Sequence, residues 1–214
     1  CVKPFVMREP RQGRFGATQL TNPGALDMTD PVWNDIETSL RQLYMLPHNN
    51  IRLAESSSTP NAEVAKKLQE IRSGISGVPR KEEFVGPKLF LRVVGPSNRA
   101  YSGEWWFDAS LLEAMEGAYS RLFFDDDEMK SALRNMLREV LAISTEWNSI
   151  EEVWALELPM RERLTGYSGI GTPQRLFGSI PLTAKGNRLL VGRARQIFFP
   201  VKNPLCVKHF RDLV

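Results

Sequence analysis

Two polar side chains stand inside apolar stretches of this sequence and are the first candidates for chemistry. Arg92 lies in LFLRVVG (89–95), and Gln196 directly precedes IFFP (197–200). Desolvating an arginine without a partner costs on the order of several kcal/mol, so Arg92 makes sense if its guanidinium grips a phosphate or carboxylate. A neutral amide can donate and accept hydrogen bonds at less desolvation cost than a carboxylate. Two simpler interpretations stay open: Arg92 faces water or an internal acidic partner, and Gln196 is an ordinary strand-edge residue.

A second group of candidates follows Arg92 closely along the chain. The segment YSGEWWF (101–107) contains Tyr101, Ser102, Glu104, Trp105 and Trp106. Aromatic rings can stack on flat groups, a serine hydroxyl can donate or accept a hydrogen bond, and Glu104 is the spare carboxylate nearest to Arg92. Because neighbours on a strand face opposite sides, at least one of the two tryptophans is expected in the core. Tyr101 and Ser102 are equally compatible with a plain turn.

Several common catalytic and cofactor motifs are absent from the sequence. It contains no GxSxG, no GxxxxGK[ST] and no GxGxxG after a predicted strand, and Ser168 in GYSGIG (166–171) lacks the context of a nucleophile elbow. Neither CxxC nor HxxxH spacing occurs, so we expect no metal site and no disulfide framework. No apolar run approaches the roughly 18 residues of a membrane span, and we recognise no secretory signal.

The net charge of +3 conceals an asymmetric distribution along the chain. Residues 81–160 hold eight Lys and Arg against fifteen Asp and Glu, whereas residues 161–214 hold ten against two. Such a basic end can attract a phosphate-bearing ligand or nucleic acid, or it can face the acidic middle within one fold. Arg193 and Arg195 share a strand face that could meet phosphates, although a solvated surface is the simpler interpretation. No known nucleic-acid motif is present, so a non-enzymatic basic binding or structural protein is the third-ranked hypothesis.

The pattern of helix and strand signals divides the chain near residue 80. Residues 1–80 are expected to form an N-terminal arm and a helical segment, with one helix that starts after the N-cap Asp30 and a second over 62–72. Residues 73–87 are interpreted as a linker. Residues 81–214 alternate strands and helices in an α+β pattern. Their predicted strands are 88–95, 102–107, 151–159 and a strand or strand pair within 188–200.

Other local signals in the sequence predict two helix starts, a long loop and two core tryptophans. Asp108 and Asp125 are expected to begin helices, because aspartate is a favoured N-cap and acidic residues suit the first turn. The segment from Thr165 to Asn187 contains five glycines and two prolines and is predicted to be a loop. Trp147 and Trp154 are expected in the core.

The ordered set of LFLRVVGPSNRAYS (89–102), GYSGIGTPQ (166–174) and VGRARQIFFP (191–200) resembles the ADP-ribosyltransferase-like superfamily of bacterial toxins. The resemblance is strongest to NAD glycohydrolases of the necrotizing-toxin type. It covers roughly residues 88–201 and implies an ADP-ribosyltransferase-like split β-sheet core with flanking helices. In this interpretation 81–214 is the catalytic domain, and 1–80 is an adaptor or a segment that contacts a carrier.

The resemblance implies cleavage of the nicotinamide–ribose bond of NAD, which is the substrate, with no metal required. Arg92 would clamp the phosphate or anchor the ribose, and Tyr101, or one of Trp105 and Trp106, would stack on nicotinamide. Ser102 would support the ribose, and Gln196 would bind the ribose hydroxyls and orient a water. If Glu104 faces the ribose instead of Gln196, a mono-ADP-ribosyltransferase acting on a protein or nucleic acid becomes the better hypothesis.

Toxins of this type imply a setting as well as a reaction. The chain would be secreted or delivered as an effector that acts in the target-cell cytoplasm. A cognate immunity protein and a secretion carrier or chaperone would be its protein partners.

Overall fold

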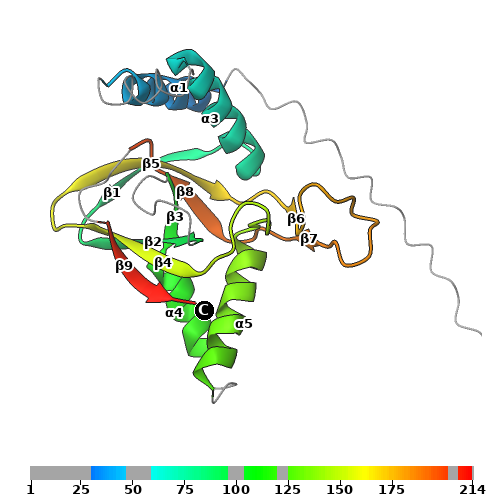
Figure 1. The fold of residues 1–214 in the computed structure, drawn as a ribbon. Helices are drawn as coiled ribbons and strands as arrows, with labels where there is room; N and C mark the ends of the chain where they lie inside the picture. Colours follow the sequence, from blue (N-terminus) through cyan, green and yellow to red (C-terminus); the bar gives the residue numbers. More distant parts are fainter. Residues whose placement is uncertain (1–29, 47–58, 96–103, 120–124, 202–206, 214) are drawn as a thin grey trace, which may run out of the picture.

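The computed structural model describes residues 30–46, 59–95, 104–119, 125–201 and 207–213. The described part is an α+β protein (Figure 1). Its helices are α1 (Pro31–Tyr44), α3 (Pro60–Gly74), α4 (Ala109–Tyr119) and α5 (Asp126–Val140). Its strands are β1 (Arg80–Val85), β2 (Lys88–Val94), β3 (Trp105–Asp108), β4 (Glu152–Leu158), β5 (Arg163–Ile170), β6 (Gln174–Arg175), β7 (Leu189–Leu190), β8 (Arg195–Phe198) and β9 (Val207–Asp212).

The main sheet is antiparallel and has the strand order β1-β5-β8-β3-β2-β4-β9. Strands β2 and β4 pair along their whole length, from Lys88 opposite Leu158 to Val94 opposite Glu152. In contrast, β2 and β3 pair only where Phe90 and Leu91 meet the end of β3. The sheet therefore consists of two halves that are joined by a short ladder between β2 and β3.

Helices cover the two halves of the sheet from different sides (Figure 1). Helices α1 and α3 pack on the β5–β8 half and share a hydrophobic cluster with Tyr167 and Phe198. Helices α4 and α5 pack on the β2–β4 half, where Leu133 and Leu137 join a cluster that includes Val153. The helical residues before 80 therefore bury their apolar faces against strands from the C-terminal half of the chain.

Helices α1, α4 and α5 begin at the aspartates that the sequence predicts. The Asp30 carboxylate accepts the Val32 amide at 2.9 Å, and Pro31 occupies the first turn of α1. Asp125 accepts the amides of Asp127 and Glu128 at the start of α5, and Asp108 accepts the Ser110 amide at 3.0 Å before α4. The strand predicted over 88–95 is confirmed as β2, and the strand predicted over 151–159 is confirmed as β4. The segment 188–200 contains two strands, β7 and β8, as one of its two interpretations predicts.

Two segments that the sequence predicts to be irregular contain strands, so the predictions were wrong for those parts. Residues 73–87 contain the edge strand β1, which pairs with β5 from Arg80 opposite Ser168 to Val85 opposite Arg163. The predicted loop from Thr165 contains most of β5, glycines included. A Cβ on Gly166 would lie 2.6 Å from the Phe199 ring, so this glycine allows close packing inside a strand.

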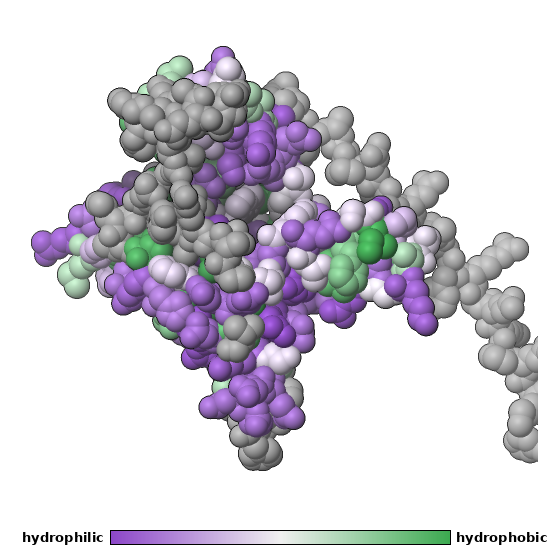
Figure 2. Space-filling view, in the orientation of Figure 1, coloured by the Kyte–Doolittle hydropathy of each residue, from purple (hydrophilic) through white to green (hydrophobic). Residues whose placement is uncertain are grey.

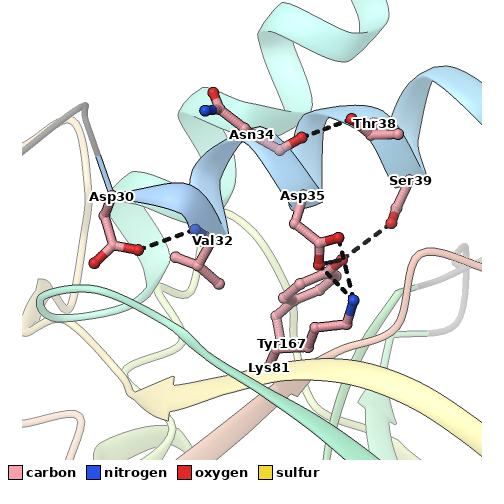
Figure 3. A network of polar contacts seen from close by, with 8 residues as sticks. All are labelled: Asp30, Val32, Asn34, Asp35, Thr38, Ser39, Lys81 and Tyr167. Atoms are coloured by element: carbon pink, nitrogen blue, oxygen red, sulfur yellow. Dashed lines mark hydrogen bonds and ion pairs between the residues drawn. The ribbon is translucent and has the colours of Figure 1, made fainter.

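A partly exposed polar network attaches α1 to the sheet (Figure 3). Asp35 accepts a hydrogen bond from the Tyr167 hydroxyl at 2.8 Å and pairs with Lys81 at 2.9 Å, and the Ser39 and Tyr167 hydroxyls lie 3.0 Å apart. Burial, together with the Asp35 charge, raises the pKa of Tyr167 to about 12. Burial acts to raise the pKa of Asp35, but Lys81 and Tyr167 outweigh it and lower that pKa. The network joins α1 to both β1 and β5.

The basic C-terminal part of the chain is partly neutralised inside the fold. Basic side chains from 161–214 form ion pairs with acidic ones from 81–160: Arg163 with Glu83, Arg188 with Glu139, Arg195 with Glu82, Lys208 with Glu157 and Arg211 with Glu116. These pairs favour the interpretation in which the basic end faces the acidic middle.

Candidate functional site

A cavity of about 540 Å³ opens where β2 and β3 separate beyond their short ladder. Arg92 and Val93 of β2, Trp105 to Phe107 of β3, and Gln196 of β8 line it from the sheet. The end of α3, the loop that follows α5 and the residues after β5 complete the wall. The structure therefore brings Arg92, Trp105 and Gln196 together from neighbouring strands, although more than a hundred residues separate the first from the last.

Arg92 enters the cavity wall from the middle of β2. Its neighbours Leu91 and Val93 are buried in the core, and Arg92 itself is half-buried. Burial lowers the pKa of the Arg92 guanidinium, and the negative charge of Glu104 opposes that shift. Arg92 therefore presents a partly desolvated positive charge, which binds an anion more strongly than a fully hydrated one does.

The side-chain amide of Gln196 is held by the backbone around it. Its Nε2 donates to the Leu141 carbonyl at 2.7 Å, which fixes which end of the amide is the donor. Among the described residues no donor reaches its Oε1, so this oxygen is available to accept a hydrogen bond from a ligand. A Cβ on Gly171 would lie 2.3 Å from Nε2, so the amide fits only because position 171 is a glycine.

The two tryptophans of β3 face opposite sides, as their adjacency in the strand predicts. Trp106 is 2% exposed and belongs to the core, whereas Trp105 is half-buried. The Trp105 indole meets the Phe198 ring edge-on, with centroids 5.5 Å apart. It also lies against the end of α3, where a Cβ on Gly74 would be 3.0 Å from the indole. Its packing partners hold Trp105 in place as an aromatic wall of the cavity.

Glu104 is buried but is not among the described residues that line the cavity. Its carboxylate lies 3.4 Å from Lys67 Nζ, and its backbone carbonyl accepts the Phe199 amide at 2.8 Å. In this arrangement Glu104 acts on Arg92 through its charge. Tyr101 and Ser102, the other sequence candidates, lie outside the described residues.

The loop between α5 and β4 forms a wall of the cavity that the sequence did not predict. The Arg138 guanidinium donates to the carbonyls of Ile143, Asn148 and Ser149 at 3.0, 2.9 and 2.8 Å. Asn148 in turn donates to the Val93 carbonyl at 3.0 Å, next to Arg92. One buried arginine therefore shapes the loop that carries the Leu141 carbonyl and much of the cavity wall. Its position in the helical pattern of α5 gave no sign of this role.

Trp147 lies in the same loop and contradicts the prediction that it is a core residue. It is 58% exposed and lines the cavity, and Trp154 is half-buried at the sheet surface. A large exposed aromatic side chain beside a cavity is a common feature of ligand sites.

A second cavity of about 490 Å³ adjoins the first and shares Trp147 and Gln174 with it. It lies beside the segment between β6 and β7, which extends away from the body of the molecule in Figure 1. That segment carries a green apolar patch in Figure 2. Ile180 within the segment is 40% exposed, and Leu189 at the start of β7 is 39% exposed.

The sequence matches no protein-family model and no curated protein. Within the described ranges, no group of three or more His, Cys, Asp or Glu side chains is placed to hold a metal ion. In the same part of the chain, no helix has both the length and the apolar character that crossing a membrane requires. The geometry of the cavity is therefore the basis for proposing a function.

Proposed function

We propose that this protein is an NAD glycohydrolase that cleaves the nicotinamide–ribose bond. The observation that carries the proposal is that Arg92, Trp105 and Gln196 line one cavity of about 540 Å³, within the usual range for small-molecule sites. A cation, a flat aromatic side chain and an amide oxygen match the diphosphate, nicotinamide and ribose of NAD. The separation of β2 from β3 supports the split-sheet core that the resemblance implies.

Each of the three side chains has a distinct role in this proposal. The Arg92 guanidinium binds phosphate oxygens, which is favourable because the group is partly desolvated. The Trp105 indole stacks on the nicotinamide ring. The Gln196 Oε1 accepts a hydrogen bond from a ribose hydroxyl or from the attacking water, because Leu141 already occupies the amide nitrogen.

The reaction breaks the bond between the nicotinamide nitrogen and ribose C1′. The electron pair stays on the nitrogen, so nicotinamide leaves as a neutral molecule and positive charge develops on C1′ and the ring oxygen. Water adds to C1′ and releases one proton to solvent, which yields ADP-ribose. The site accelerates this reaction by holding the substrate in place and by favouring the cationic sugar.

A mono-ADP-ribosyltransferase is the second candidate, and one observation favours it. The second cavity adjoins the first at Trp147 and Gln174 and borders the exposed apolar segment between β6 and β7. An acceptor side chain of a macromolecule that docks there would reach the same ribose carbon in place of water.

Incubation of the purified chain with NAD labelled in both halves tests the proposal. We expect nicotinamide and free ADP-ribose in equal amounts. ADP-ribose bound to an added protein or nucleic acid would establish the transferase instead, and the absence of nicotinamide release at micromolar enzyme would refute both. In cells, expression of an active chain should deplete NAD, as expected of a delivered toxin.

A further inference from the structure

We propose that Glu70 of α3 is a catalytic residue whose carboxylate stabilises the cationic ribose during bond cleavage. The inference rests on the proposed NAD-cleaving function and extends the site to the helical segment before residue 80. Among the described residues that line the main cavity, Arg92 and Glu70 are the charged ones. NAD cleavage needs both signs of charge, because its phosphates are negative whereas the reacting sugar becomes positive.

The end of α3 is fixed to the sheet and is a permanent part of the cavity wall. The Gly74 carbonyl accepts the Thr172 amide at 2.9 Å, and the Ser73 carbonyl accepts the Gln174 side-chain amide at 3.1 Å. Just beyond the helix, the Ser76 amide donates to the Ile170 carbonyl at 2.8 Å. These bonds satisfy carbonyls that a helix end leaves open, and they join α3 to the end of β5.

The Glu70 carboxylate is held in position by a lysine on the same helix. Lys67 Nζ lies 2.7 Å from a Glu70 oxygen and 3.4 Å from a Glu104 oxygen. The side chains of Lys67 and Glu104 are only 19% and 6% exposed, whereas that of Glu70 is 38% exposed. Lys67 therefore pairs most closely with Glu70 and also interacts with Glu104, and Glu70 is the more exposed of the two carboxylates and the one that lines the cavity.

Lys67 stays charged and keeps the Glu70 carboxylate at the cavity wall. Burial acts to lower the pKa of Lys67, but Glu104 and Glu70 outweigh it and raise that pKa, so the lysine stays protonated. With Arg92, whose guanidinium also interacts with Glu104, the cluster holds two positive and two negative charges, and the negative charge that lines the cavity is that of Glu70. The C-terminal end of α3 adds a partial negative charge of the same sign.

The role of Glu70 follows from the direction in which charge moves. As the bond to nicotinamide breaks, the positive charge that the nicotinamide ring carried passes to C1′ and the ring oxygen of ribose. A carboxylate held against that ribose interacts more strongly with the transition state than with bound NAD, which raises kcat and leaves KM nearly unchanged. The water proton still leaves to solvent, so Glu70 forms no bond in this scheme.

The test compares Glu70→Gln with Glu63→Gln, which removes the same charge two turns earlier on α3 at a residue that does not line the cavity. We expect kcat for nicotinamide release to fall at least thirtyfold in Glu70→Gln, with KM changed by less than threefold. Glu63→Gln should remain within threefold of wild type in both constants. Thermal unfolding of both variants, monitored by circular dichroism, shows that the fold is retained.

The possible outcomes separate this inference from the proposed function. Wild-type activity together with an unchanged kcat in Glu70→Gln would overturn the role of Glu70 and leave the proposed function standing. A change confined to KM would overturn it too, because it would make Glu70 a residue for ground-state binding. A wild-type chain that releases no nicotinamide would overturn both.

Discussion

Gly171 lies so close to Gln196 that a single added methyl group would occupy the position of the side-chain amide. A Cβ at residue 171 would lie 2.3 Å from Gln196 Nε2, and the same nitrogen donates to the Leu141 carbonyl at 2.7 Å. The orientation of the amide therefore depends on a glycine just after β5 and a carbonyl just after α5. These two residues are far apart in sequence from the strand that carries Gln196.

We first predict that Gly171→Ala lowers NAD turnover at least tenfold, because the amide must rotate away and lose its bond to Leu141. The folded protein should lose about 1–3 kcal/mol of stability, as is typical when a packed region receives an extra methyl group. Gly117→Ala is the control, because a Cβ there meets nothing within 4 Å in helix α4. Nicotinamide release and chemical denaturation measure both effects, and wild-type turnover in Gly171→Ala would contradict the proposed role of the amide.

The second prediction concerns the two residues that first suggested a site. Arg92→Ala and Gln196→Ala should each lower turnover at least a hundredfold while the fold survives, since they remove the proposed phosphate-binding cation and the proposed hydroxyl-binding oxygen. Gln69→Ala, at an exposed position of α3, should have wild-type activity. Near-normal rates in either cavity variant would refute the site.

Third, removal of the Arg138 guanidinium should destabilise the loop between α5 and β4. Arg138→Met leaves three backbone carbonyls without their donor, and we expect a loss of about 3 kcal/mol or more in unfolding free energy. Arg134→Met removes the same charge one turn earlier on α5 and should cost less than about 1 kcal/mol. Urea denaturation distinguishes them, and equal stability of the two variants would show that the carbonyl contacts contribute little.

Fourth, replacement of Trp147 should mainly raise KM for NAD, whereas replacement of Trp106 should mainly lower the unfolding free energy. Trp147→Ala should change the unfolding free energy by less than about 0.5 kcal/mol and raise KM for NAD several-fold, because the indole is 58% exposed beside the cavity. Trp106→Ala should cost about 3–5 kcal/mol, because its indole is 2% exposed within the core. A large loss of stability in Trp147→Ala would mean that its indole supports the fold.

The fifth prediction concerns acid stability. The pKa of Asp35 is lower in the folded protein than its usual value, so the unfolded chain binds a proton more readily. The stabilisation by Asp35 is therefore present above the unfolded pKa of about 4 and is lost as the pH falls through the folded pKa. Asp35→Asn should flatten the decline of the unfolding free energy below about pH 4. Asp127→Asn, at a side chain that is 92% exposed, should leave that decline unchanged.

Local patterns in the sequence were sufficient for most of the elements that carry the site. The caps at Asp30, Asp108 and Asp125 and the apolar runs of β2, β4 and β8 depend on residues that are close together in the chain, so they can be recognised without a fold. The isolated polarity of Arg92 and Gln196 is a signal of the same kind. These features sufficed to predict an α+β protein.

Strand β1 is mostly polar and β5 is interrupted by glycines, so neither has the composition of a typical strand. Strand β1 forms because β5 offers it a ladder of hydrogen bonds, and β5 pairs with both β1 and β8. The pairing of β1 with β5 joins residues about 80 positions apart. The cavity wall from α3 and Glu70 depends on the same long-range pairing, because the end of α3 is bonded to the end of β5.

The sequence by itself therefore determined the helices, the apolar strands and two of the polar side chains at the cavity, because propensity, capping and periodicity act over a few residues. The tertiary structure decided which side chains meet: it brought Glu70 and the Arg138-bound loop to the cavity and placed Glu104 outside its lining. Strand register and helix docking are set by contacts between distant segments, and no local pattern encodes them.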